Sequence, residues 1–130
     1  DNAKVFGNAR VYGDARITDE AIVSDNAIVC GSAWLYDKSM VYCNAVVSGN
    51  ARVYGDARIY GDAFVRGNAS IYGHSKVCGN AMVYGNADVS GNVCVTENAK
   101  VYGDAIVYGD VNVCGYAHID EEVRSCFQNK

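Results

Sequence analysis

The sequence predicts an all-β chain wound as a triangular solenoid of about seven coils, because one six-residue unit recurs along it. All 14 glycines lie at positions separated by multiples of six residues, from Gly7 to Gly115. From Val5 to Ile119, every sixth residue is Val, Ile or Leu. Such a chain gains stability by stacking each unit on its neighbours, so it needs no central globular core.

The second part of each unit is predicted to be a short strand. The unit reads Gly-(Asn/Asp)-Ala-x-(Val/Ile)-x, as in residues 55–60. Because side chains alternate across a strand, Ala57 and Ile59 point to one side while Arg58 and Tyr60 point to the other. The small and β-branched residues suit a packed, pleated surface, so we place them inside the solenoid.

The Gly-Asn or Gly-Asp pair is predicted to make the corner that follows each strand. A sharp corner needs a positive φ, which glycine adopts freely and Asn or Asp tolerates. Three strands and three corners close a triangle of 18 residues. Stacked Asn side chains form hydrogen-bonded ladders between coils. We expect two such ladders, one of Asn26, Asn44, Asp62, Asn80 and Asn98 and one of Asn50, Asn68 and Asn86.

The Gly-Asn-Ala-x-Val-x unit resembles the hexapeptide repeat of left-handed parallel β-helix proteins, in the variety found in uncharacterised bacterial and phage-encoded proteins. The resemblance implies a single-stranded left-handed parallel β-helix over residues 1–123. Residues 124–130 are expected to form an irregular tail or partial cap. The unit is also distantly similar to that of hexapeptide acyltransferases. In those enzymes the glycine usually follows the aliphatic residue directly, whereas here another residue intervenes, as in Val53-Tyr54-Gly55.

Composition narrows the classes of partner and compartment. The formal net charge of −4 and the scattered cations disfavour nucleic-acid binding, which needs a basic stripe. No apolar run is long enough for a membrane span, so we expect no membrane association. No two of the six cysteines are 18 residues apart, as direct stacking in adjacent coils would require. Diagonal neighbours lie roughly 7–8 Å apart, too far for a relaxed disulfide. Free thiols favour the cytoplasm.

The histidines and cysteines, which could act as catalytic groups or metal ligands, do not form a recognisable catalytic or metal-binding set. Acyltransferases of the hexapeptide type use a histidine, and this chain has His74 at a corner and His118 on an outward strand position. We interpret both as surface residues. Three cysteines share one outer side, Cys78, Cys94 and Cys114, but a diagonal row does not converge as the ligands of a metal do. The sequence therefore predicts no catalytic residue, no metal and no cofactor.

The outward positions define three sides of the prism. Ile28, Val46, Phe64 and Met82 form a continuous apolar ladder on one side, and contiguous apolar surface often marks an interface. We expect self-association as a dimer or trimer, or a protein partner, at this ladder. A second candidate binding face carries Trp34, Tyr36, Arg52, Tyr54 and Tyr72, residue types that anchor partners but also stabilise sheets. The remaining side has no single chemical character.

These observations favour a non-enzymatic, rigid β-solenoid scaffold or protein-binding module, as one segment of a larger or phage-related protein. The first alternative is an acyltransferase-like enzyme, with its active site at a subunit interface or outside this chain. The second is an acidic decoy that inhibits a nucleic-acid-binding partner through Asp56, Asp62, Asp104 and Asp110.

Overall fold

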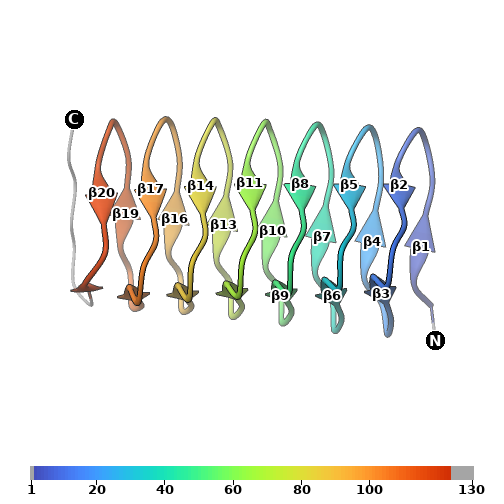
Figure 1. Ribbon diagram of the computed structural model, residues 1–130, viewed down its shortest axis with the longest axis horizontal. Helices are drawn as coiled ribbons and strands as arrows, with labels where there is room; N and C mark the ends of the chain where they lie inside the picture. Colours follow the sequence, from blue (N-terminus) through green and yellow to red (C-terminus); the bar gives the residue numbers. More distant parts are fainter. Residues whose placement is uncertain (1, 124–130) are drawn as a thin grey trace.

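The computed structural model describes residues 2–123 as a three-sided prism made of three seven-stranded parallel sheets (Figure 1). The first sheet contains β1 (Lys4–Val5), β4 (Ile22–Val23), β7 (Met40–Val41), β10 (Arg58–Ile59), β13 (Lys76–Val77), β16 (Cys94–Val95) and β19 (Asn112–Val113). The second contains β2 (Arg10–Val11), β5 (Ile28–Val29), β8 (Val46–Val47), β11 (Phe64–Val65), β14 (Met82–Val83), β17 (Lys100–Val101) and β20 (His118–Ile119). The third contains β3 (Arg16–Ile17), β6 (Trp34–Leu35), β9 (Arg52–Val53), β12 (Ser70–Ile71), β15 (Asp88–Val89), β18 (Ile106–Val107) and β21 (Glu122–Val123).

The coil of 18 residues predicted from the glycine spacing is confirmed. Each strand pairs in parallel with the strand one coil away, so Arg58 of β10 lies between Met40 and Lys76. Backbone hydrogen bonds link successive coils at the same offset, as from the Arg58 N–H to the Ser75 carbonyl (3.0 Å). The N-terminal and C-terminal coils lie at opposite ends of the prism (Figure 1).

The core is the inside of the prism, as predicted. The alanine and aliphatic positions of the unit alternate along the chain and are almost completely buried from Ala21 to Ile119. Leu35, Ile59 and Ile71 are the largest of the fully buried side chains. Val5 occupies the same inward position in the first coil but remains 47% exposed, because no described coil covers that end.

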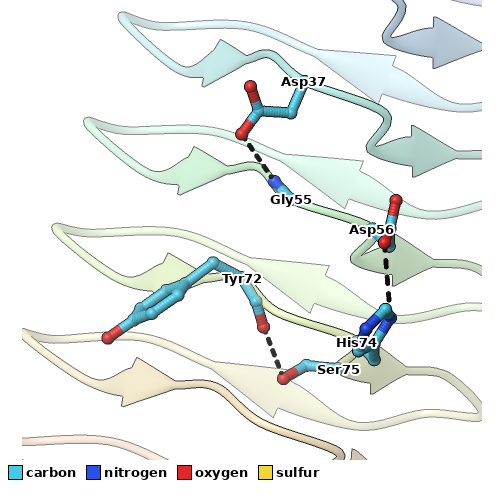
Figure 2. A network of polar contacts seen from close by, with 6 residues as sticks. All are labelled: Asp37, Gly55, Asp56, Tyr72, His74 and Ser75. Carbon is cyan, nitrogen blue, oxygen red and sulfur yellow. Dashed lines mark hydrogen bonds and ion pairs between the residues drawn. The ribbon is translucent and has the colours of Figure 1, made fainter.

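The corners follow the predicted conformation, including those that lack glycine. All 14 glycines have positive φ, and so do Asp19, Asp25, Asp37, Cys43 and Glu97. The acidic residues gain a compensating contact, since each carboxylate accepts the backbone N–H of the corner one coil later. Figure 2 shows this for Asp37, whose Oδ2 lies 3.1 Å from the Gly55 nitrogen. Substituting Asp for Gly therefore replaces conformational freedom with a hydrogen bond.

Two serines replace the inward alanine and differ in their partners. The Ser75 hydroxyl donates to the Tyr72 carbonyl at 2.8 Å (Figure 2). The Ser39 hydroxyl is buried and finds no hydrogen-bond partner among residues 2–123. An unsatisfied buried hydroxyl carries a desolvation cost of about 1–3 kcal/mol.

The last described coil is shorter than the others. Ile106 pairs with Glu122 and Val107 with Val123, two residues earlier than the 18-residue repeat would place their partners. Val123 thereby takes the aliphatic position that the period assigns to Ser125. The expected tail or cap at 124–130 lies outside the described residues. No helix suited to crossing a bilayer is found within residues 2–123.

Candidate functional site

We call the outward sides of the three sheets the first, second and third faces, after the sheets that form them. The lysines and arginines within residues 2–123 lie on or directly after strands of these faces, with Lys38 as the exception. Most carboxylates lie instead at the corners, where Asp and Asn satisfy the turn geometry. The first and second faces therefore carry more cations than carboxylates, although the chain has a net charge of −4.

The apolar ladder predicted on the second face is present as a continuous row. Ile28, Val46, Phe64 and Met82 stand in direct register on four successive strands, and all four side chains are half-buried. Arg10 and Lys100 occupy the same row at its two ends. The Arg66 guanidinium lies over the rings of Phe64 (5.5 Å) and Tyr84 (4.7 Å). The ladder is an apolar strip bounded by cations.

The aromatic residues predicted on the third face form a stacked column. The ring of Tyr54 lies 4.7 Å from that of Tyr36 and 4.8 Å from that of Tyr72, with interplanar angles of 4° and 3°. Burial within this column raises the pKa of the Tyr54 hydroxyl above its usual value. The Trp34 indole N–H donates to the Thr18 hydroxyl at 3.1 Å. Since neighbouring rings cover both faces of Tyr54, that ring is not free to stack on a flat ligand.

The first face, for which the sequence predicts no single character, carries an open groove of about 920 Å³. One wall is the outward strand row of Ile22, Met40, Arg58, Lys76 and Cys94, which successive registers place in a single line. The other wall is the corner row of Glu20, Lys38, Asp56, His74 and Asn92. The strand row can be listed from the 18-residue spacing alone. Its members are partly apolar and partly charged, so no shared residue type marks the row as a site.

The two histidines occupy unrelated places. His74 projects from a corner into the groove, with its Nδ1 3.4 Å from Asp56 Oδ2 (Figure 2). Its side chain is 69% exposed. His118 lies on β20 of the second face, where its ring meets that of Tyr102 edge-on at 6.3 Å. The predicted surface location thus holds for both, but His74 has a carboxylate partner that the sequence did not reveal.

Two of the cysteines interact with tyrosine hydroxyls, Cys30 with Tyr12 and Cys78 with Tyr60. Cys30, Cys43, Cys78 and Cys94 are free thiols. A hydrogen bond with the Cys78 thiol, together with burial, raises the pKa of Tyr60 to about 12. Burial raises the pKa of the Cys94 thiol, and the neighbouring Cys78 adds to this effect. Within residues 2–123, no three His, Cys, Asp or Glu side chains are grouped so as to hold a metal ion.

The four carboxylates of the decoy hypothesis do not gather on one surface. Asp62 and Asp104 lie on two different corners of the triangle, while Asp56 and Asp110 share the remaining one. Asn44 donates to Asp62 and Asn86 to Asp104, so these two carboxylates end ladders of amides, while Asp110 accepts a hydrogen bond from Asn92. Of the predicted ladder from Asn26 to Asn98, the part from Asn26 to Asp62 is confirmed, and the ladder from Asn50 to Asn86 is confirmed over its whole length.

Comparisons with known proteins agree with this architecture. A family model described as the YdcK beta solenoid repeat matches three segments, residues 3–19, 9–25 and 76–91. No curated protein matches the chain, and no solved structure does. The hexapeptide period, the three parallel sheets and these matches agree on the architecture. The chain is a repeat β-helix protein, similar in the matched segments to the YdcK beta solenoid repeat.

Proposed function

We propose that this chain is a non-enzymatic, rigid scaffold that binds protein through the apolar ladder of the second face. The observation that carries the proposal is the register of Ile28, Val46, Phe64 and Met82, which aligns four half-buried apolar side chains along the axis. A solenoid holds such a row rigidly, since each strand is fixed by its neighbours on both sides. Binding therefore requires little ordering of the surface itself.

The occupant that the surface charges favour is a second copy of the chain. The second face adds Arg10, Arg66 and Lys100 to the apolar ladder. The C-terminal half of the third face supplies the opposite combination, with Asp88 and Glu122 on either side of Ile106, which is 45% exposed. Complementary charges of this kind select and orient partners. A copy that presents its third face would thus match the second face in both charge and polarity.

The test is the mass of the protein in solution, measured by light scattering after size exclusion in reductant. Contacts between unlike faces of a three-sided prism can close as a ring of three copies, so we expect a trimer for the natural chain and a monomer for Phe64→Glu, which places a charge in the centre of the ladder. Asn112→Glu is the matched control, since it adds the same charge to an exposed strand position of the first face. A monomeric natural chain would overturn the second copy as occupant. Assembly that survives Phe64→Glu would remove the ladder from the interface.

An acyltransferase-like activity is the second candidate, and one observation favours it. The Asp56 carboxylate beside His74 Nδ1 is an arrangement that orients a histidine as a general base. Its exposure to solvent is the opposing observation, because catalytic bases usually work in sheltered sites. Turnover of an acyl-coenzyme A by the natural chain, lost in His74→Ala and kept in His118→Ala, would establish this activity. Absence of turnover in the natural chain would exclude it for these residues.

A further inference from the structure

The groove of the first face holds two stacked cations that the fold does not explain. Arg58 of β10 and Lys76 of β13 are direct register partners, and both side chains are exposed. Like charges placed opposite each other on neighbouring strands are destabilising. Among residues 2–123, neither cation has a carboxylate within ion-pair distance; the one such pair is His74 with Asp56. The two charges thus repel each other across a strand spacing of ~4.8 Å without an internal counter-ion.

The corner wall of the groove adds Lys38 and His74, together with the carboxylates of Glu20 and Asp56. His74 precedes Lys76 by two residues and Lys38 lies two coils earlier on the same wall. Asp56 engages His74 through Nδ1 (Figure 2), which leaves Nε2 as the imidazole nitrogen available to another group. The centre of the groove therefore combines a guanidinium, an ammonium and an oriented imidazole. Such groups converge where a protein binds a phosphate or another dianion.

The N-terminal end of the same row has a different character. Ile22 and Met40 are half-buried and stand in register directly before Arg58. A ligand that lies along the axis would meet an apolar surface for two coils and a cationic surface for the next two. This change from apolar to cationic surface favours a ligand with both characters, since an inorganic anion would contact only the cationic surface.

From this row we infer that the groove binds a phosphate monoester with an apolar substituent. Arg58 and Lys76 would hold the phosphate oxygens, and the imidazolium form of His74 could donate to them from Nε2, while the substituent would lie on Met40 and Ile22. Bound phosphate removes the repulsion between the two cations, so binding also stabilises the coils that carry them. This inference is independent of the second face and of any self-association there.

The experiment is calorimetric titration of the full chain with phenyl phosphate and with inorganic phosphate, at constant ionic strength. We expect phenyl phosphate to bind more tightly, and Lys76→Gln or Arg58→Gln to weaken it about tenfold through loss of one charge-assisted contact. Lys4→Gln is the matched control, because it removes the same charge from the same strand position of the first face, outside the groove. Co-sedimentation with phosphatidic-acid vesicles distinguishes a lipid phosphate from a soluble monoester.

Three results would overturn the inference. The first is that phenyl phosphate does not bind to the natural chain. The second is an equal loss of binding in Lys4→Gln and Lys76→Gln, which would reduce the effect to general charge. The third is equal affinity for inorganic and phenyl phosphate, which would remove the apolar part of the site. Circular dichroism of each variant shows whether the fold is retained, and the exposed positions of Arg58, Lys76 and Lys4 favour retention.

Discussion

Replacing Gly49 with alanine tests how tightly the coils approach each other at the corners. Gly49 has a φ of +68°, and a Cβ atom there would lie 2.7 Å from the nitrogen and 2.9 Å from the oxygen of Gly67 in the next coil. Two costs therefore combine. A left-handed conformation costs a non-glycine residue about 1–2 kcal/mol. Forcing backbone apart to admit a methyl group costs about 1–3 kcal/mol. We expect Gly49→Ala to lower the free energy of unfolding by about 2–5 kcal/mol.

Gly103 separates these two costs, because it shares the conformation but not the close approach. Its φ is +63°, and an added Cβ would find Asp120 Cβ as its nearest neighbour at 3.6 Å, an ordinary contact. Gly103→Ala should thus cost only about 1–2 kcal/mol. Alanine restricts the unfolded chain equally in both variants, so that effect cancels in the comparison. Urea unfolding followed by circular dichroism gives both free energies.

The aspartates that naturally occupy glycine positions suggest a third variant, in which Gly49 is replaced by Asp. Asp37 occupies a glycine position and accepts the N–H of Gly55 in the next coil at 3.1 Å. Gly49→Asp should form the equivalent bond with the Gly67 N–H and so cost less than Gly49→Ala, although aspartate is the larger residue. Equal losses for Gly49→Ala and Gly103→Ala, or a greater loss for Gly49→Asp than for Gly49→Ala, would refute the reasoning.

Two other predictions concern hydroxyl groups. Ser39→Ala should raise the free energy of unfolding by about 1–3 kcal/mol, because the Ser39 hydroxyl is buried without a partner among residues 2–123. Ser75→Ala should lower it by about 0.5–1.5 kcal/mol, because a hydrogen bond to Tyr72 is lost. Urea unfolding that shows a change in the same direction for both variants would contradict this. The Tyr60 pKa is raised from 10.0 to about 12, so the unfolded chain ionises first and stability falls as pH rises between these values. Tyr60→Phe should show a smaller fall over that range, and an identical pH profile would disprove the contribution.

The sequence predicts the fold almost completely because each structural requirement recurs at a fixed interval. Glycine at the corner, alanine beside it and a branched residue in the strand leave one arrangement in which all inward side chains pack. Val5 and Val123 mark where that logic weakens. The first is inward but exposed at the open end, and the second takes its place only because the last coil is two residues shorter. The period itself breaks at Ser125, which stands where an aliphatic residue is due, but the break does not tell which residue takes that place.

The candidate sites are less predictable because they depend on relations between coils. Register follows from the period, so the row from Ile28 to Met82 can be derived from the spacing of its residues alone. The pairing of His74 with Asp56 requires side chains at neighbouring corners to turn towards each other, which spacing does not determine. The groove likewise forms between a corner row and a strand row of residues, and neither row by itself indicates a groove in the sequence.

The same geometry limits where this protein can carry a function. Corners need Gly, Asn or Asp, and inward positions need small or branched apolar residues, so four of the six positions in each unit are constrained by folding. Only the two outward positions are free to vary. On the second face they carry an apolar row closed by Arg10 and Lys100, and on the first they pass from Met40 to Arg58 and Lys76. Since folding alone does not favour stacked cations, the pairing of Arg58 with Lys76 is the strongest sign of an external ligand.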